Sequence, residues 1–294
     1  MIRYLTRSQV DFSKYDNCVL DSINSRVYGY SWYLDAVCDT WDVLVLDDYD
    51  AVMPLPRRVK YGINYIYQAP WIQQLGLFSD KKIESKLFED FIQKIPKKFK
   101  LIDMMLNSSN HFSINRMEPR DNFVLPLENS SYQVLLKGYS KGRKSSVKQA
   151  QKFGLKIKKT ISADSIIELF RENKGEDLQK SAQDYLALQR LVNQGQLLGE
   201  ILIYEVFNSN DKLLGGAIFL KDKYRITNLF SALNNLGREK QAMSFLIDFI
   251  IKHHAGQPFV LDFEGSMITK IASFYKSFGA IKETYFQYKK WQLI

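Results

Sequence analysis

Two carboxylates and a tyrosine stand close together near the C-terminal end of the sequence. Asp262 and Glu264 end a short apolar run and lie two positions apart, which places both side chains on one face of an extended strand. Tyr275 falls on the last turn of a helix that we expect to stop at Gly279. A carboxylate can take a proton from an attacking amine, and a tyrosine can donate one to a leaving group. Glu264 and Tyr275 are therefore the candidate catalytic pair.

Structural roles are open for the same residues. Asp262 can pair with a lysine, and Ser266 can cap the helix that runs to Phe278. Tyr275 can belong to the core, as aromatic residues at helical spacing often do. Ser266, in the Gly-Ser turn after the carboxylates, is also a candidate substrate-binding residue.

The net charge of +9 is concentrated in one interval of the 294-residue chain. Between Glu128 and Asp164 there is no acidic residue, whereas nine positions are basic. These are Lys137, Lys141, Arg143, Lys144, Lys148, Lys152, Lys156, Lys158 and Lys159. A localised excess focuses its field on one surface, which indicates an anionic partner.

A helix is predicted inside this interval, with Ser140 as its N-cap and Gly154 just past its end. Helical spacing puts four lysines on one stripe, which also fits a simply solvated face: Lys141, Lys144, Lys148 and Lys152. Arg143 falls instead with Val147 and Ala150, on the side that should be buried. Guanidinium is seldom buried without an anionic partner, so Arg143, with Lys144 beside it, is a candidate for binding an anionic substrate group.

The two halves of the chain share an order of elements. The first has helical patterns at 11–22 and 31–39, strands at 42–47, 50–57 and 63–68, a helix at 83–94 and a strand at 99–106. The second has helical patterns at 162–173 and 180–193, strands at 199–207, 212–220 and 224–231, a helix at 238–254 and a strand at 258–263. This order predicts an α/β protein made by internal duplication, with domains at 1–130 and 131–294, the second including the basic helix.

The C-terminal pattern Ala272-x-x-Tyr275-x-x-x-Gly279 resembles the final strand-helix unit of the GNAT N-acyltransferase fold. In that family the equivalent tyrosine often acts as a general acid. Two βββαβ lobes back to back resemble the FemABX family, as does Arg143-x-x-x-Val147-x-x-Ala150. The resemblance implies two GNAT-like lobes packed together. It also implies transfer of an aminoacyl group from tRNA to an amine of a peptidoglycan precursor.

The run Arg238-Glu-Lys-Gln241-Ala-Met243 occupies the register of the GNAT turn that binds the coenzyme A pyrophosphate. Arg238 matches that pattern and is a candidate substrate-binding residue, although a cation gains nothing from a helix start. Gln241 and Met243 replace the small residues that let phosphates approach the backbone. The departure disfavours acyl-CoA as the donor and favours an aminoacyl-tRNA.

Gln73 and Gln74 lie in a loop that follows a predicted strand and is dense in amides and aromatics. Loops at a sheet edge often line ligand sites, so both are candidate substrate-binding residues. They can equally hydrogen-bond the loop backbone.

Composition narrows the class of protein. With 46% hydrophobic and 25% charged residues, the chain is typical of an ordinary globular protein. Two cysteines, a short polar N-terminus and the lack of a long apolar run predict a cytoplasmic protein without an integral membrane segment. No metal-ligand spacing, phosphate loop or Ser-His-Asp arrangement is recognised.

Three functions follow from these patterns. The first is a FemABX-like transferase that acts on an anionic small-molecule or glycopeptide acceptor, with aminoacyl-tRNA as donor. The second is an acyl-CoA N-acetyltransferase with an altered pyrophosphate loop. The third is a non-catalytic protein that binds an anionic ligand.

Overall fold

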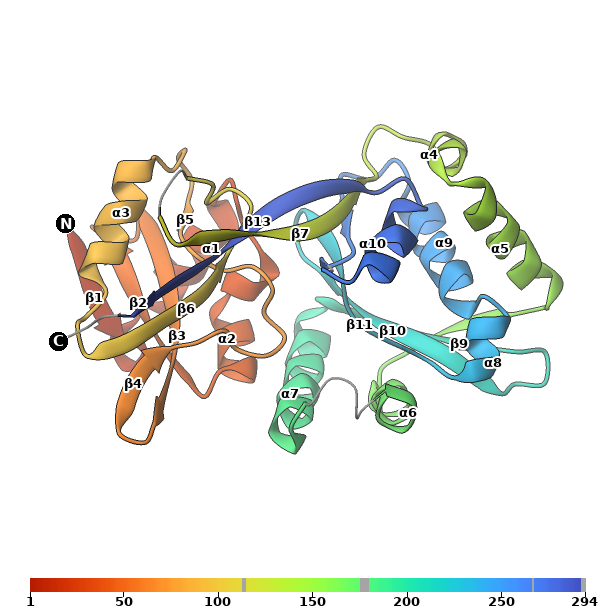
Figure 1. Cartoon of the computed structure of the whole chain (residues 1–294), viewed down its shortest axis with the longest axis horizontal. Helices are drawn as coiled ribbons and strands as arrows, with labels where there is room; N and C mark the ends of the chain where they lie inside the picture. The colour runs from red at the N-terminus through yellow and green to blue at the C-terminus, as the bar shows by residue number, and fades with distance from the viewer. Residues whose placement is uncertain (113–114, 175–179, 266, 292–294) are drawn as a thin grey trace. The chain divides into compact units, whose positions relative to one another are not determined.

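The structure is a computed structural model that describes residues 1–112, 115–174, 180–265 and 267–291 (Figure 1). The chain divides into two compact units. Unit 1 comprises Met1–Asp121 and Glu283–Ile294, and unit 2 comprises Asn122–Lys282.

Unit 1 is a mixed sheet with helices on both faces. Its strands are β1 (Ile2–Thr6), β2 (Thr40–Leu46), β3 (Ala51–Lys60), β4 (Ile63–Ile66), β5 (Phe78–Ser79) and β6 (Phe99–Leu106). Its helices are α1 (Phe12–Asp21), α2 (Ser31–Val37) and α3 (Ser85–Lys94), with 3₁₀ turns at Arg7–Gln9 and Val27–Gly29. The strand order is β1-β2-β3-β4-β6, with β5 beside β3. Neighbouring strands are antiparallel except β4 and β6, which are parallel.

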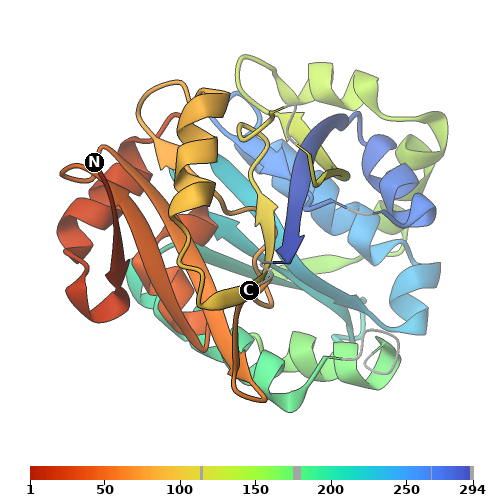
Figure 2. The ribbon, with the colours of Figure 1, turned by 60° about the vertical axis from the view of Figure 1, so that its left-hand side comes forward.

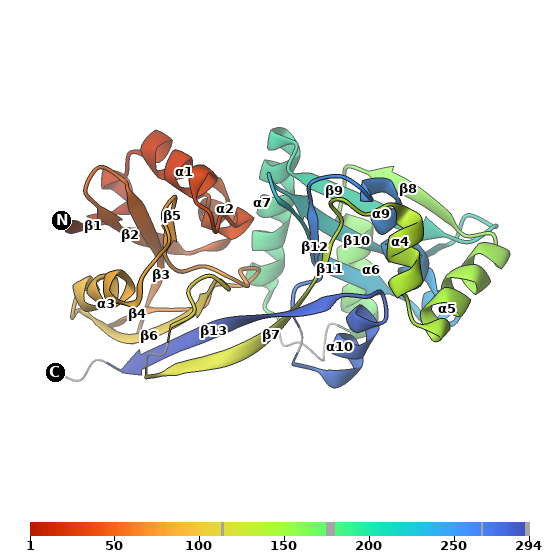
Figure 3. The same cartoon turned by 90° about the horizontal axis from the view of Figure 1, so that it is seen from above.

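Alternation along β2 explains why both faces of this sheet are covered. Leu44 belongs to the core cluster that contains Phe88 and Phe91 of α3. Trp41, on the opposite face, packs against Tyr15 of α1 with 5.2 Å between ring centroids. Because successive strand residues point to opposite faces, α3 covers one side and α1 the other. Figures 2 and 3 show this arrangement, with α2 beside α1.

Unit 2 repeats the architecture of unit 1. Its strands are β8 (Lys156–Thr160), β9 (Ile201–Phe207), β10 (Leu213–Lys221), β11 (Arg225–Leu233) and β12 (Val260–Asp262). Its helices are α4 (Tyr132–Gly138), α5 (Lys141–Lys152), α6 (Asp164–Lys174), α7 (Ala182–Leu198), α8 (Asn235–Glu239), α9 (Ala242–His254) and α10 (Thr269–Lys276). The strand order is β12-β11-β10-β9-β8, and only β11 and β12 are parallel.

Two adjacent residues of β10 assign the helices to the faces of this sheet. A Cβ atom on Gly216 would stand 2.7 Å from Ile166 of α6, so the missing side chain lets that helix approach closely. Ala217 instead belongs to the core cluster with Leu246 and Ile250 of α9. Helix α6 therefore lies on one face and α9 on the other, as Figure 1 shows.

The last strand of each repeat completes the sheet of the other unit. Strand β7 (Met117–Pro126) follows β6 in the chain, yet its residues Val124–Pro126 pair with β12. Strand β13 (Ile281–Trp291) follows α10, yet its residues Phe286–Trp291 pair with β6. The observed division at residue 121 and the return of the C-terminal segment to unit 1 both differ from the expected domains 1–130 and 131–294.

The predicted duplication is confirmed by the order of elements. Each repeat has a first strand, two helices, three antiparallel strands, a helical segment, a parallel strand and the exchanged last strand, and the second repeat adds α10 before that last strand. The chain is therefore an α/β protein with two βββαβ lobes, as predicted. Within the described ranges, no helix is both long enough and apolar enough to cross a bilayer.

Candidate functional site

The parallel strands β11 and β12 separate in the middle of unit 2. They pair only between Arg225–Thr227 and Val260–Asp262, although β11 continues to Leu233. The pairing register between β10 and β11 shifts at Leu229 of β11, which has no partner residue on β10. A bulge of this kind bends a strand and often re-aims side chains next to active sites. The end of β12 is thus where the sheet opens.

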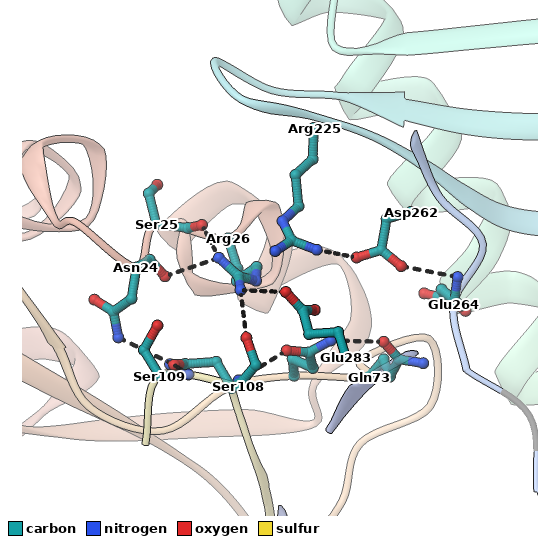
Figure 4. Close-up of polar contacts among 12 residues, drawn as sticks. Asn24, Ser25, Arg26, Gln73, Ser108, Ser109, Arg225, Asp262, Glu264 and Glu283 are labelled. Carbon is teal, nitrogen blue, oxygen red and sulfur yellow. Dashed lines mark hydrogen bonds and ion pairs between the residues drawn. The ribbon is translucent and has the colours of Figure 1, made fainter. Parts of the chain in front are cut away.

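Asp262 sits at this point and makes two contacts with different oxygens. Its Oδ2 accepts a hydrogen bond from Arg225 Nη1 at 2.6 Å, and the two side chains are 1% and 10% exposed. Its Oδ1 accepts a hydrogen bond from the backbone N–H of Glu264 at 3.0 Å (Figure 4). Asp262 therefore forms an ion pair, which is the structural role considered from the sequence. Its partner is an arginine and not the expected lysine.

Glu264 lies beyond the strand, which changes the predicted geometry of the pair. We expected a strand over 258–263 that would point Asp262 and Glu264 to one face, but β12 ends at Asp262. Glu264 has a φ of 49°, in the left-handed region that an L-residue other than glycine seldom adopts. Such a conformation costs about 1–3 kcal/mol and clusters at functional sites. The half-buried Glu264 is therefore held by a local turn.

Tyr275 packs on Phe263, the residue between the two carboxylates. It lies on α10, and its ring stacks on Phe263 with 4.8 Å between centroids. Burial, followed by the negative charges of Glu264 and Asp262, raises the pKa of Tyr275 well above its usual range. The hydroxyl thus stays protonated at neutral pH and lies within electrostatic reach of both carboxylates.

Asn228 is a polar residue of this region that the sequence pattern did not single out. It stands on β11 directly after the last residue that pairs with β12, and it is 7% exposed. Its Oδ1 is buried and accepts no hydrogen bond from the residues that the structure describes. An unsatisfied buried acceptor is costly, and it suits a site where a ligand supplies the donor. The available signal was an asparagine within the predicted strand at 224–231, whose residues 226–230 read Ile-Thr-Asn-Leu-Phe.

Arg143 lies against the helix that carries Tyr275. Its Nε donates to Ser277 Oγ at 2.9 Å, and its Nη1 donates to Ser244 Oγ. The guanidinium carbon stands 4.2 Å from the ring centroid of Phe274 and 4.6 Å from that of Phe278. The prediction that Arg143 faces inward is thereby confirmed, and α5, α9 and α10 together position it.

The charge of Arg143 is not balanced within the described part of the chain. No carboxylate there pairs with it, and burial lowers its pKa to about 10. Ser244 is the third residue of α9, so the guanidinium lies at a helix N-terminus, where the dipole disfavours a cation. Both effects would be relieved by an anion, and free N–H groups at a helix start are suited to bind one.

The basic helix has the predicted ends and faces. Ser140 accepts a hydrogen bond from the backbone N–H of Arg143 at 3.2 Å, and Gly154 has a φ of 64° just past the helix. Lys141, Lys148 and Lys152 are exposed, while Lys144 is half-buried and donates to the carbonyl of Lys137 at 3.0 Å. A role of Lys144 in substrate binding stays a prediction.

The helix predicted over 238–254 is interrupted. Residue Gln241 has a φ of 62° and separates α8 from α9. Arg238 is exposed, lies in the last turn of α8 and donates to Asn235 Oδ1 at 2.9 Å. It is therefore not at the start of a helix as expected. The left-handed turn at Gln241 is a conformation that glycine would adopt without strain.

Gln73 and Gln74 lie in unit 1, after β4. Gln74 is fully buried, and its Oε1 accepts the backbone N–H of Ser108 at 3.1 Å while its Nε2 donates to Gln73 Oε1 at 3.0 Å. These contacts hold the loop in place, which is the structural role that the sequence also allowed for the two glutamines. Binding of a substrate by either glutamine stays a prediction.

In unit 1 this loop fills the position that corresponds to the gap between β11 and β12 in unit 2. Leu75 forms a parallel bridge with Leu106 at the end of β6, so pairing resumes beyond β4. Buried amides fix the loop, because Asn107 donates to the carbonyl of Leu75 at 2.8 Å and the Asn110 side chain accepts the backbone N–H of Leu77 at 2.7 Å. The open lobe, unit 2, is therefore the better candidate for a reaction centre.

A second polar cluster of unit 1 surrounds Arg26, which is 7% exposed. Its guanidinium donates to the Ser25 carbonyl and to Ser108 Oγ, both at 2.9 Å, and lies 3.9 Å from Glu283 (Figure 4). It thereby ties the loop before α2 to the end of β6.

Ser266, the remaining predicted site residue, lies outside the described residues. Among the described residues, no cluster of three His, Cys, Asp or Glu side chains is placed to hold a metal ion.

Comparison with known proteins places this architecture among tandem GNAT folds. No family model matches the sequence, and no curated protein sequence matches it. Among solved structures, FemX aligns with a TM-score of 0.69 and 12% identity over 97% of this chain and 96% of FemX.

Two other solved structures share the fold. A tandem GNAT protein from the clavulanic acid biosynthesis pathway aligns with a TM-score of 0.56 and 8% identity over 100% of this chain and 99% of its own. The C-terminal domain of a putative lysylphosphatidylglycerol synthetase from Agrobacterium fabrum gives 0.55 and 9%, over 95% and 91%. The chain thus has the tandem GNAT fold of the FemX type, which confirms the predicted resemblance in fold.

Proposed function

We propose that the protein is an N-acyltransferase whose reaction centre lies in unit 2, where β11 and β12 separate. One observation carries the proposal: the half-buried Tyr275 stacks on Phe263, the residue between Asp262 and Glu264, and the negative charges of both carboxylates contribute to the raised pKa of its hydroxyl. A neutral acid beside a carboxylate is the pair that acyl transfer to an amine requires. The similarity in fold to FemX and to a tandem GNAT protein supports the same class of reaction.

The proposed reaction is attack of an acceptor amine on an activated acyl ester. The amine nitrogen forms a bond to the carbonyl carbon and loses a proton to Glu264. The bond from that carbon to the leaving oxygen or sulfur then breaks, and Tyr275 protonates the leaving group. Asp262 positions the base through the backbone N–H of Glu264 and does not exchange a proton itself. The buried Asn228 acceptor is suited to hold the N–H of an acyl amide or amine.

The anionic part of a substrate is assigned to Arg143. An unbalanced guanidinium held against two phenylalanine rings binds a phosphate or carboxylate with a defined orientation. We favour an aminoacyl-tRNA as donor and an anionic peptidoglycan precursor as acceptor, following the FemABX resemblance. Acyl-CoA is the second donor, and the left-handed turn at Gln241 before α9 is the observation in its favour.

The test is transfer of a radiolabelled acyl group to an amine. Purified protein is incubated with aminoacyl-tRNAs or with acetyl-CoA, in the presence of a soluble peptidoglycan precursor or simple amines. Labelled amide is expected from the aminoacyl-tRNA reaction, and loss of a positioned acid or base in Tyr275→Phe or Glu264→Gln should cost about 10²–10⁴ in rate. Product from acetyl-CoA alone would reverse the order of donors. Ligand-induced stabilisation without any product would favour a binding protein.

A further inference from the structure

Three large apolar side chains stand in solvent at the start of α10. Met267 is 61% exposed, Ile268 is 57% exposed and Ile271 is 38% exposed. We call these three residues the apolar ridge. They lie within five positions of the chain, whereas an isolated exposed apolar residue is ordinary and needs no explanation.

The ridge continues the buried face of α10 beyond the core. Ile271 precedes Tyr275 by four residues, so the two share one side of the helix. Tyr275 and Phe278 pack against the core of unit 2, but the helix extends past that core at its first turn. The amphipathic face of α10 is thus only half covered within unit 2.

The helix start is also poorly suited to solvent. Ile268 occupies the N-cap position, where Ser, Thr, Asp or Asn would accept a backbone hydrogen bond. Replacement of such a residue by an apolar one typically costs about 1 kcal/mol. The Ile268 side chain is 57% exposed and makes no capping hydrogen bond.

The surroundings of the ridge are basic. The segment 265–282, which lies between Glu264 and Glu283, contains no acidic residue and three exposed lysines, Lys270, Lys276 and Lys282. The end of α10 contacts the basic helix, because the backbone N–H of Ser140 donates to the carbonyl of Ser277 at 2.9 Å. The lysine stripe of α5, defined by Lys141, Lys144, Lys148 and Lys152, therefore begins beside the C-terminal end of α10, whereas the ridge lies at the start of this helix.

We propose that the apolar ridge docks α10 onto the surface of an anionic lipid bilayer. Apolar side chains flanked by lysines are the pattern that lies in a membrane interface, with the ridge among the acyl chains and the lysines among the headgroups. A nucleic acid would satisfy the lysines but offers no apolar layer for the three ridge residues. The docking goes beyond acyl transfer and does not require it.

Sedimentation with lipid vesicles tests the proposal on the full chain. Binding is expected to vesicles that contain phosphatidylglycerol, to weaken as salt is raised, and to be much weaker for pure phosphatidylcholine. Met267→Ser with Ile271→Ser should lower the partition coefficient about tenfold. Lys270→Gln with Lys276→Gln should lower it about 30-fold, since each lysine near an anionic surface contributes about 1 kcal/mol.

Leu197→Ser is the matched control, because Leu197 is 82% exposed on α7, outside the ridge. It should bind vesicles like the unchanged protein, and thermal melting should show all variants folded. Equal binding by the ridge variant, or no binding to anionic vesicles at low salt, would overturn the proposal. Binding to RNA without binding to vesicles would also overturn it. Because no acyl transfer is measured, failure of this test leaves the proposed reaction untouched.

Discussion

Asp262 holds the backbone N–H of Glu264 at 3.0 Å with one oxygen and the guanidinium of Arg225 at 2.6 Å with the other. One carboxylate therefore both balances a buried cation and fixes the turn that carries the candidate base. The end of β12, the Asp262–Arg225 ion pair and the left-handed Glu264 are linked by these two contacts. A change in any one of them should therefore alter the geometry of the other two.

Removal of the Asp262 charge should destabilise unit 2. Asp262→Asn removes the carboxylate charge that Arg225 Nη1 contacts at 2.6 Å in a buried ion pair, so the free energy of unfolding should fall by about 3–5 kcal/mol. Urea denaturation measures this loss. Asp211→Asn, which removes an exposed partner of Lys158, is the control and should change little. Replacing both members, as Arg225→Met with Asp262→Leu, should recover much of the loss.

Glycine at position 264 should separate stability from activity. Glu264→Gly relieves the positive φ of 49°, which should add up to about 1 kcal/mol to the free energy of unfolding. The same change removes the candidate base, so acyl transfer should fall by about 10²–10⁴. Glu264→Gln keeps the strain and loses the base. A glycine variant that retains full turnover would exclude Glu264 from the chemistry.

Arg143 should make thermal stability depend on anions. Inorganic pyrophosphate at about 100 times its dissociation constant should stabilise the protein by about 2.7 kcal/mol. Arg143→Gln should abolish this gain, and Arg143→Lys should restore only part of it, because ammonium lacks the planar contact with Phe274 and Phe278. Lys148→Gln, on the exposed stripe of the same helix, is the control. An equal gain in the Arg143→Gln variant would contradict the assignment.

The features predicted correctly from the sequence are those set by local chemistry. Ser140 and Gly154 mark the ends of the basic helix because capping and positive φ are properties of single residues. The inward position of Arg143 followed from helical periodicity alone. The repeated order of elements was visible for the same reason, since each element carries its own pattern.

The features that were missed depend on contacts between distant segments. The exchange of β7 and β13 is a choice of pairing partner, which no periodicity encodes. Glu264 looked like a strand residue until the Asp262 carboxylate captured its backbone N–H. The break at Gln241 was hidden because a glutamine, and not a glycine, adopts the left-handed turn. An asparagine within a strand was a weak signal in the sequence, and the structure distinguishes Asn228 by its buried, unsatisfied oxygen.

Stability should fall on acidification because of His254. This residue is 9% exposed, its Nδ1 lies 2.9 Å from the carbonyl of Ile250, and burial lowers its pKa below the usual 6.5. The unfolded chain then binds more protons, so stability is fully present above pH 6.5 and decreases as the pH falls below it, by at most about 1.4 kcal/mol per pH unit. His254→Gln should flatten this slope in denaturation curves recorded from pH 7.5 to 5. His253→Gln, at the exposed neighbouring position, should leave it intact.

The exchanged strand predicts that a C-terminal residue stabilises the N-terminal unit. Tyr288 is 4% exposed, pairs with Met104 of β6 and packs against Phe88 of α3 with 6.5 Å between ring centroids. Tyr288→Ala should therefore cost about 3 kcal/mol or more. Amide hydrogen exchange should show the loss of protection in β6 and α3, with α9 unchanged. Trp291→Ala, on the same strand but 64% exposed, should leave exchange in both units as it was. Loss of protection in α9 instead would mean that β13 belongs energetically to the repeat that encodes it.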